Sequence, residues 1–277
     1  MRVNEAIVEF KHISMQFPGV LANDDVSLRV NKGEIFALVG ENGAGKSTLM
    51  NILYGLNQPT SGELFIKGTA VGKNSPSTAI SLGVGMVHQH FKLVPSFTVA
   101  QNIVLAREPV KRKVFYDFKE SVEIVRRLTD EYGLEIDPEA RVEELSIGLE
   151  QRVEILKTLF RGADILILDE PTAVLTPHET SELFAVLRRM VREKGMTVII
   201  ITHKLYEVME ISDRVGVMRA GKLVGVVDTE KVDERTLASM MVGREMLLSA
   251  IEHNSEAGES VIEVRNLRVL SDRGIEA

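Results

Sequence analysis

Runs of apolar residues without polar alternation recur along the chain, and segments with helical patterns separate them. Strands covered on both faces of a parallel sheet have this uniform apolar character, because neither face meets water. Four runs fit such strands, at residues 35–39, 84–87, 165–168 and 198–201. Their alternation with helices predicts an α/β protein built on a largely parallel sheet.

Helical patterns dominate between the second and the third of these runs. The clearest pattern places Val122, Val125 and Leu128 on one face of a helix that stops at Gly133, a residue type that commonly ends helices. We therefore predict a helical subdomain over residues 91–162, inserted into an α/β core.

The core itself is assigned to residues 1–90 and 163–245. A polar segment at 246–259 follows and resembles a linker. Residues 260–277 then repeat the pattern of the first strand-like stretch of the chain. In both places an apolar pair leads to a lone glutamate, and an apolar, a basic, a polar and an aliphatic residue follow.

Composition narrows the class of protein. The formal net charge of −7 argues against broad nucleic-acid binding, and the lack of cysteine excludes a disulfide framework and thiolate metal sites. The purely aliphatic runs are far too short to span a bilayer, and the N-terminus lacks the layout of a signal peptide. These features predict a soluble cytoplasmic protein.

The most specific chemical motif is 'GENGAGKS' at residues 40–47, which fits the phosphate-loop pattern G-x-x-x-x-G-K-[ST] between a strand and a helix. Its glycines let backbone N–H groups turn toward phosphate oxygens, and the following helix presents its positive end. Lys46 is expected to reach the β- and γ-phosphates, and the Ser47 hydroxyl to ligate Mg²⁺. The residues expected to bind the nucleotide here are Gly40, Glu41, Asn42, Gly43, Ala44, Gly45, Lys46, Ser47 and Thr48.

Polar residues also follow the third and fourth apolar runs. Asp169 is placed to hold Mg²⁺ and Glu170 to polarise an attacking water, because the chain already turns at the end of a strand. The alternative is a plain charge pair at a helix N-terminus. His203 is expected to contact the γ-phosphate, since parallel sheets bind ligands at the carboxyl ends of their strands, and a structural histidine is the alternative.

With these motifs in place, 'LSIGLEQ' at residues 145–151 resembles the signature of the ATP-binding subunits of ABC transporters, usually LSGGQ. Ser146 is a natural helix N-cap, and a helix N-terminus led by serine and glycine suits a γ-phosphate. The resemblance implies that Ser146 and Gly148 bind the nucleotide of an opposite domain, in a head-to-tail sandwich of two ATP molecules. It covers nearly the whole chain and implies a P-loop NTPase core with an antiparallel β subdomain and a helical subdomain.

The resemblance assigns roles to further positions. Gln89 falls at the Q-loop, which links Mg²⁺ and the attacking water to the helical subdomain. Phe17 takes the place of an aromatic residue that stacks on adenine, with a core or turn aromatic as the alternative. The implied cofactors are ATP and Mg²⁺, with Ser47, Gln89 and Asp169 around the metal. Gln89, Glu170 and His203 are the implied catalytic residues, the last as the switch histidine.

The sequence departs from the family pattern at two motifs. Ile147 replaces the first of the paired glycines of the signature, while Ser146 and Gly148 remain. Thr176 stands where the D-loop, here residues 171–176, commonly ends in aspartate. Thr176 and Glu179 predict a capping box at the start of a helix, so we expect Thr176 to be structural first.

Within the family, the closer resemblance is to the branch that imports simple sugars and nucleosides. It is carried by the signature segment, by 'PTAVLTP' (171–177) and by 'MVGRE' (241–245). 'GMVHQHFKLVPSFTVAQNI' (85–103) leans toward its nucleoside-type members. Subunits of this branch carry two ATP-binding domains, so the repeat at 260–277 is expected to begin a second, truncated one. The implied partners are that second domain, transmembrane permease subunits and, indirectly, an extracytoplasmic solute-binding protein, with no nucleic acid.

The implied function is that of an importer motor, peripheral at the cytoplasmic face of the cell membrane. A soluble ABC ATPase of translation or DNA repair is the main alternative. Such proteins usually carry a long charged linker, cysteine pairs or a coiled-coil insertion, and the sequence favours none of these. A regulatory domain that binds ATP without hydrolysis is a third hypothesis, and a single-domain subunit with a coincidental strand-like tail is a fourth.

Overall fold

The computed structural model describes residues 5–89, 91–111, 115–243, 265 and 268. The chain divides into two units, Met1–Met246 and Leu247–Ala277, and all the elements below belong to the first. The expected linker at 246–259 lies outside the described residues, and so does the expected start of a second domain at 260–277, apart from two isolated positions.

A six-stranded sheet, in the order β12-β11-β3-β10-β9-β6, forms the centre of the first unit. Its strands are β3 (Ile35–Val39), β6 (Val84–Val87), β9 (Ile165–Asp169), β10 (Thr197–Thr202), β11 (Arg214–Arg219) and β12 (Lys222–Asp228). The four strands expected from the sequence are consecutive in this sheet and mutually parallel, which confirms the prediction. Their carboxyl ends therefore share one edge, where ligands bind in such sheets.

A second sheet, of four strands, is antiparallel and has the order β2-β1-β4-β5. Its strands are β1 (Ala6–Phe17), β2 (Val20–Asn31), β4 (Ser61–Ile66) and β5 (Thr69–Val71). Along β2 buried and exposed residues alternate from Asp25 to Val30, as in a sheet with one face on the core. This sheet is the antiparallel β subdomain that the family resemblance implied.

Eight α-helices are described: α1 (Lys46–Leu53), α2 (Pro76–Ser81), α3 (Val99–Val104), α4 (Phe118–Tyr132), α5 (Ile147–Phe160), α6 (Pro177–Lys194), α7 (Leu205–Ile211) and α8 (Glu234–Val242). Two short 3₁₀ turns, η1 (Val142–Glu144) and η2 (Thr229–Lys231), complete the helical elements of the described residues. Among the described helices, none combines the length and apolar character that crossing a bilayer requires.

The helix expected to end at Gly133 is α4, so that prediction is confirmed. Asp117 caps its start by accepting from the Glu120 backbone N–H, and Gly133 ends it with a φ of 63°. The same region also holds two short antiparallel strands, β7 (Val110–Lys111) and β8 (Phe115–Tyr116), which the dominant helical patterns of the region did not predict. β-Branched and aromatic residues favour the extended conformation there.

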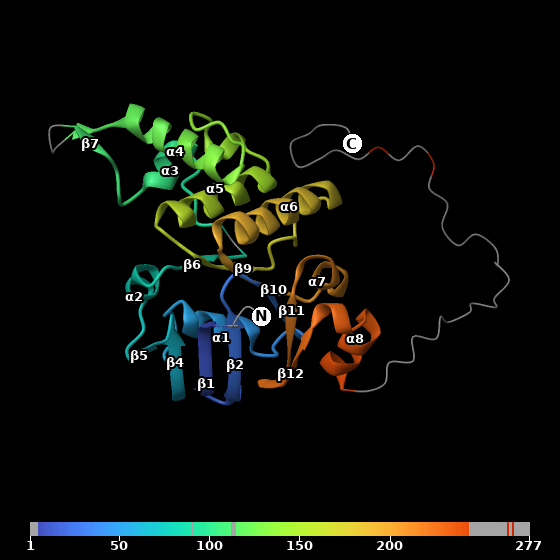
Figure 1. The fold of residues 1–277 in the computed structure, drawn as a ribbon. Helices are drawn as coiled ribbons and strands as arrows, with labels where there is room; N and C mark the ends of the chain where they lie inside the picture. Colours follow the sequence, from blue (N-terminus) through green and yellow to red (C-terminus); the bar gives the residue numbers. More distant parts are fainter. Residues whose placement is uncertain (1–4, 90, 112–114, 244–264, 266–267, 269–277) are drawn as a thin grey trace. The chain divides into compact units, whose positions relative to one another are not determined.

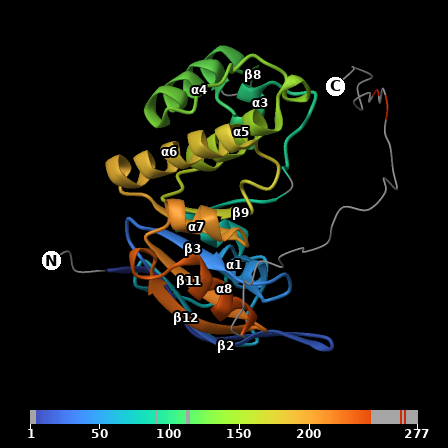
Figure 2. The same cartoon turned by 90° about the vertical axis from the view of Figure 1, so that its right-hand side faces the viewer.

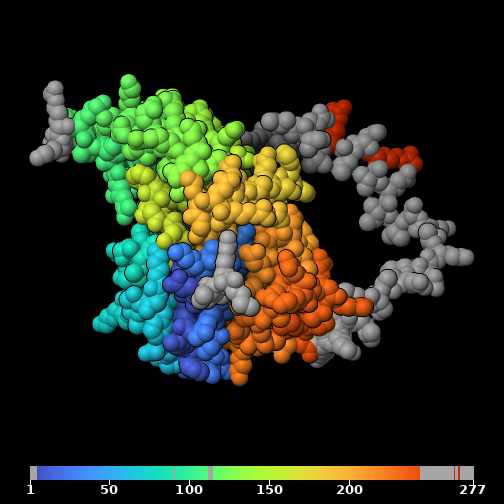
Figure 3. All heavy atoms as spheres, in the orientation of Figure 1, coloured from blue at the N-terminus to red at the C-terminus, as the bar shows by residue number. Residues whose placement is uncertain are grey.

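The layers are visible in Figures 1 and 2, where α5 and α6 lie side by side between the two sheets and the outer helices α3 and α4. In the space-filling view of Figure 3, α6 (yellow) lies between the green helical segment and the blue and orange core. Alternate residues of β9 enter different cores: Ile165 and Ile167 pack with α1 and the antiparallel sheet, Leu166 and Leu168 with α3 to α6. This burial on both faces explains the uniform apolar strands.

Candidate functional site

The phosphate loop (40–47) connects β3 to α1, and close packing requires two of its glycines. A Cβ on Gly40 would lie 2.3 Å from the Met218 carbonyl oxygen, and one on Gly45 2.2 Å from that of Ala22. Gly45 also has a φ of 95°, a left-handed conformation that favours glycine. The loop is therefore pressed against its neighbours, with its backbone fixed for binding.

Lys46 curls back over this loop. Its Nζ donates to the Gly40 carbonyl oxygen over 2.7 Å and to that of Glu41 over 3.0 Å, and the residue is only 6% exposed. Burial lowers the pKa of the Lys46 ammonium, although the carboxylates of Glu170 and Asp169 oppose the shift. An ammonium in this position needs anionic partners, which phosphate oxygens supply.

Asn23 of β2 supports the phosphate loop through a hydrogen bond, and the sequence analysis did not identify it. It is wholly buried, and its Nδ2 donates to the Gly45 carbonyl oxygen over 3.1 Å. Its Oδ1 has no hydrogen-bond partner among the described residues. In the sequence Asn23 precedes two aspartates, a polar run typical of a turn, so no local signal distinguished it.

Asp169 ends β9 and faces the start of α1. Burial and the neighbouring Glu170 raise the pKa of Asp169, while a hydrogen bond with Ser47 and the charge of Lys46 lower it. Carboxylate and hydroxyl oxygens are the hard donors that Mg²⁺ prefers. A cation at this point would offset the repulsion between the two carboxylates.

Glu170 connects two other predicted residues. Its Oε1 lies 2.9 Å from His203 Nδ1, and its Oε2 accepts from Gln89 Nε2 over 3.3 Å. The Glu170 backbone is left-handed, with a φ of 48°, and its N–H donates to the Ile201 carbonyl oxygen on β10. Because of this turn, the Glu170 side chain does not continue the in-and-out alternation of side chains along β9. A non-glycine residue adopts such a φ only where its neighbours hold it.

The sequence analysis also did not identify a buried glutamate on α7, the helix that follows β10. Glu207 of α7 is 1% exposed, and its Oε1 accepts from the Thr172 hydroxyl over 2.5 Å and pairs with Lys204 Nζ at 3.1 Å. Its Oε2 accepts from the Thr202 hydroxyl over 3.2 Å. Glu207 therefore joins the segment after Glu170 to the strand before His203.

The phosphate loop, Gln89, Asp169 and Glu170 line one groove, with a volume of about 600 Å³. It is lined by Phe17, Val20, Ala22, Asn42, Gly43, Ala44, Gly45, Lys46, Ser47, Thr48, Gln89, Asp169 and Glu170. Phe17 is 38% exposed at the end of β1, beside the turn that leads to β2, so it is not a core aromatic and its side chain borders the groove. The structure thus brings together Phe17, the phosphate loop, Gln89, Asp169 and Glu170, with His203 attached through Glu170.

The chain that follows Gln89 is tied to α5. Glu154 accepts from the Lys92 backbone N–H over 2.9 Å, and Lys157 Nζ donates to the Lys92 carbonyl oxygen over 3.0 Å. The two side chains also pair with each other at 3.4 Å, and each residue is 8% exposed. They line a second groove of about 250 Å³, together with Tyr54, Leu56, Pro76, Ile80, Val84, Gly85, Met86, His88, Lys92, Thr158, Arg161 and Ala163.

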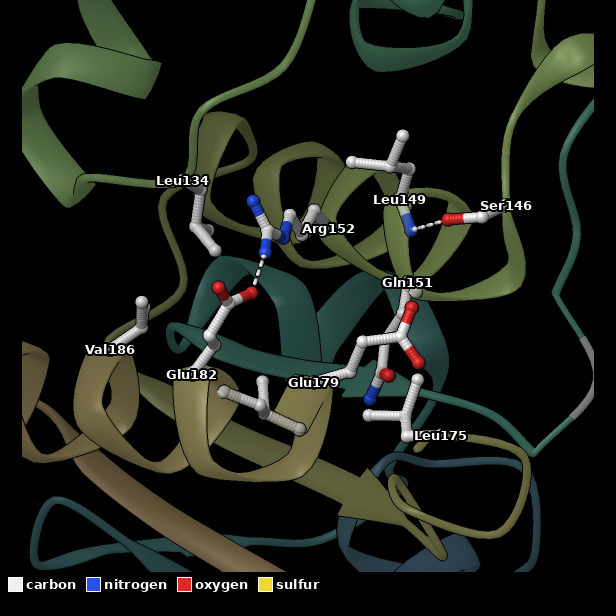
Figure 4. A pocket seen from close by; sticks show the side chains of 11 residues that line it. Leu134, Ser146, Leu149, Gln151, Arg152, Leu175, Glu179, Glu182 and Val186 are labelled. Atoms are coloured by element: carbon white, nitrogen blue, oxygen red, sulfur yellow. Dashed lines mark hydrogen bonds and ion pairs between the residues drawn. The ribbon is translucent and has the colours of Figure 1, made fainter. Parts of the chain in front are cut away.

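Ser146 and Gly148 do not line the phosphate groove. They lie at the N-terminal end of α5, where Ser146 Oγ accepts from the Leu149 N–H over 3.4 Å as the expected N-cap. A separate pocket of about 130 Å³ opens there between α5 and α6 (Figure 4). The predicted capping box is present on α6, with Thr176 as its N-cap and Glu179 as the reciprocal partner.

Comparison with known proteins identifies the family of this chain. The family model described as "ABC transporter" matches residues 23–173. Guanosine import ATP-binding protein NupO of Bacillus subtilis is 52% identical over 98% of this chain and 53% of its own length. Glucose import ATP-binding protein TsgD13 of Haloferax volcanii is 46% identical over 99% of this chain and 54% of its own. The chain thus spans about half the length of these curated relatives.

The fold has a close counterpart among solved structures. A dimeric ATP-binding cassette in a post-hydrolysis state, bound to ADP and phosphate, superposes with a TM-score of 0.69 at 24% identity, over 80% of this chain and 98% of that one. At this identity the likeness concerns the fold alone. With the family model over more than half of its residues, the chain belongs to the ABC transporter family.

Proposed function

We propose that this chain is an ATP-binding and ATP-hydrolysing motor of an importer for a simple sugar or nucleoside. The observation that carries the proposal is the single groove that combines Lys46 of the phosphate loop with Asp169 and Glu170, the latter bonded to Gln89 and His203. The import names of the relatives favour this function over a soluble ATPase of translation or DNA repair.

In the proposed reaction Glu170 orients and polarises a water for attack on the γ-phosphorus, and the bond to the bridging oxygen breaks to release ADP. Gln89 and His203 hold both oxygens of the Glu170 carboxylate, which limits its rotation toward unproductive positions. His203, about half exposed, is placed to contact the γ-phosphate and to respond to its loss.

The remaining groove residues bind rather than react. Phe17 stacks on adenine, the phosphate-loop N–H groups and Lys46 hold the phosphates, and Ser47, Asp169 and Gln89 hold Mg²⁺. The oxygen-rich donor set fits this ion. When bound to these residues, Mg²⁺ would supply the charge neutralisation that phosphate transfer needs.

Ser146 and Gly148 serve the nucleotide of a second ABC ATPase domain. Their position outside the phosphate groove supports this assignment, since they line the pocket between α5 and α6 instead. The second domain belongs either to the same longer protein or to a second copy.

The permease subunits dock through a short cytoplasmic helix in the second groove. Leu56, 48% exposed, gives that groove an apolar contact, and Lys92, three residues after Gln89, also lines it. A helix seated there can report to the Q-loop, and the chain is then peripheral at the cytoplasmic face of the membrane. An extracytoplasmic binding protein supplies the solute, and the 52% identical guanosine importer favours a nucleoside.

Docking is tested by co-purification of Leu56→Glu with the permease. We expect the charged side chain to abolish co-purification, whereas Val224→Glu, at a comparably exposed apolar position on β12, keeps it. Equal retention by both variants contradicts this docking site.

Hydrolysis is tested by measuring Mg²⁺-dependent ATP turnover over a range of protein concentrations, beside Glu170→Gln. A rate that rises as the square of concentration and is lost in the variant means that two copies form the sandwich. Tight ATP binding without turnover means that a different second domain supplies the signature. No ATP binding at all contradicts the proposal, and the exposed Glu193→Gln is the matched control for the charge change.

A further inference from the structure

The D-loop and the signature segment meet at the N-terminal ends of two helices. Glu179 of α6 points toward the first turn of α5 in Figure 4, and both helix ends line the same small pocket. Thr176 stands at the end of this D-loop in place of the aspartate that is common there. The contact concerns residues that the phosphate groove does not use.

One carboxylate oxygen of Glu179 is committed to its own helix. Oε2 accepts from the Thr176 N–H and from the Thr176 hydroxyl, each over 2.9 Å, and Thr176 Oγ1 accepts in return from the Glu179 N–H. These bonds lower the pKa of Glu179, through the Thr176 backbone first, so the group is ionised at neutral pH. The side chain is thereby fixed at the end of the D-loop.

The other oxygen lies against α5. A Cβ on Gly148 would come within 2.6 Å of Glu179 Oε1 and 3.1 Å of its Cδ. Gly148 lies inside α5 and has no left-handed φ, so its backbone alone tolerates any residue. Within this chain, the Glu179 carboxylate is therefore the nearest obstacle to a side chain at 148, and relieving the contact means moving a group that Thr176 holds in place.

An ion pair joins the same two helices one turn further along. Arg152 of α5 pairs with Glu182 of α6, with NH2 and Oε2 2.6 Å apart (Figure 4). Gln151 beside it is 2% exposed, and its Nε2 has no hydrogen-bond partner among the described residues. The contacts Glu179–Gly148 and Arg152–Glu182 together form the helix joint between α5 and α6. They surround the small pocket of about 130 Å³.

We propose that Glu179 is a positioning residue that fixes the signature end of α5 to the D-loop, by packing against Gly148 while it caps α6. Displacement of the D-loop then moves Ser146 and Gly148 together with α6. The link requires the absence of a side chain at 148 and a carboxyl or amide group at 179, and it does not require an aspartate at 176. It rests on the proposed function only in giving Ser146 and Gly148 a nucleotide to bind.

A double-mutant cycle on thermal unfolding tests the packing contact. Alanine is a better helix former than glycine, so Gly148→Ala should raise the melting temperature by roughly 1–4 °C where nothing obstructs it. We expect Gly148→Ala to lower the melting temperature of the natural chain and to raise it in a Glu179→Ala background. The same shift in both backgrounds overturns the proposal, and Glu179→Ser is the second background if Glu179→Ala does not fold.

Amide hydrogen exchange separates positioning from capping. We expect Glu179→Ala to speed exchange at residues 149–151 of α5 as well as at the start of α6, and Glu179→Gln to restore both, since glutamine also completes a capping box. Thr176→Ala is the matched control, because it weakens the cap and leaves the Glu179 carboxylate in place; it should speed exchange in α6 only.

Faster exchange in α6 alone after Glu179→Ala makes Glu179 a plain cap and contradicts the proposal. Both measurements use the chain without nucleotide. Their failure therefore leaves the hydrolysis test of Glu170 unaffected, and failure of that test leaves this contact unaffected.

Discussion

The carboxyl edge of the central sheet and the joint between α5 and α6 hold charged groups in different ways. At the sheet edge Lys46 is 6% exposed and the carboxylates of Asp169 and Glu170 lie half-buried beside it, so charges are close together and partly shielded from water. At the helix joint the side chains of Arg152 and Glu182 are 27% and 44% exposed, and water screens their pair.

This difference separates two tasks. At the sheet edge the carboxylates of Asp169 and Glu170 repel each other and Lys46 is buried, which lowers the stability of the fold without ligand. A ligand that brings a cation to the carboxylates and phosphate oxygens to Lys46 offsets this loss. The helix joint only has to keep two helix ends in register, and packing against Gly148 and capping by Thr176 achieve this with little buried charge. Substitutions at the two regions should therefore differ in size and in sign.

The largest loss of stability is expected at Glu207. Glu207→Ala leaves the Thr172 and Thr202 hydroxyls without their buried acceptor, which costs about 2–4 kcal/mol in the free energy of unfolding. Urea denaturation measures this value. Glu207→Gln keeps one oxygen in place and should lose distinctly less; an equal loss in both variants would show that the carboxylate charge, not its acceptor geometry, matters.

ATP affinity should respond most strongly to Lys46. Lys46→Ala removes a charge-assisted donor to phosphate, which is worth about 1.5–3 kcal/mol, or roughly a 10- to 100-fold increase in Kd. Titration with a fluorescent ATP analogue checks this prediction. The exposed Lys73→Ala is the matched control, and an unchanged Kd for Lys46→Ala places the nucleotide elsewhere.

Asp169→Asn should stabilise the chain without nucleotide and weaken the Mg²⁺ dependence of ATP binding. The pKa of Asp169 is raised in the fold, so its favourable contribution is present below its unfolded value and is lost as pH rises through the folded pKa. The melting temperature of the variant relative to the natural chain should therefore increase with pH over that range. A difference that shrinks with rising pH contradicts the assigned burial and repulsion.

The smallest effect is expected for the exposed ion pair at the joint. A double-mutant cycle of Arg152→Ala and Glu182→Ala should give a coupling of about 0.2–1 kcal/mol, smaller at high salt. Urea unfolding at two salt concentrations measures it. A coupling as large as the loss at Glu207 removes the contrast between the two regions.

Local patterns were sufficient for much of the fold. The uniform apolar runs predicted β3, β6, β9 and β10, Gly133 predicted the end of α4, and the spacing of Thr176 and Glu179 predicted the capping box. Strands β7 and β8 were missed because they have two residues each, too few for a period.

The sequence by itself determined the four buried parallel strands, the end of α4, the capping box of α6 and the phosphate loop, because these depend on hydrogen bonds and periodicity among residues close together in the chain. Only the tertiary structure decided that Glu170 bonds both Gln89 and His203, that Asn23 supports Gly45, and that Glu207 joins two strand ends. It also decided that Glu179 abuts Gly148. Each of these contacts joins segments far apart in sequence, and strand order and helix packing, which no local pattern encodes, bring them together.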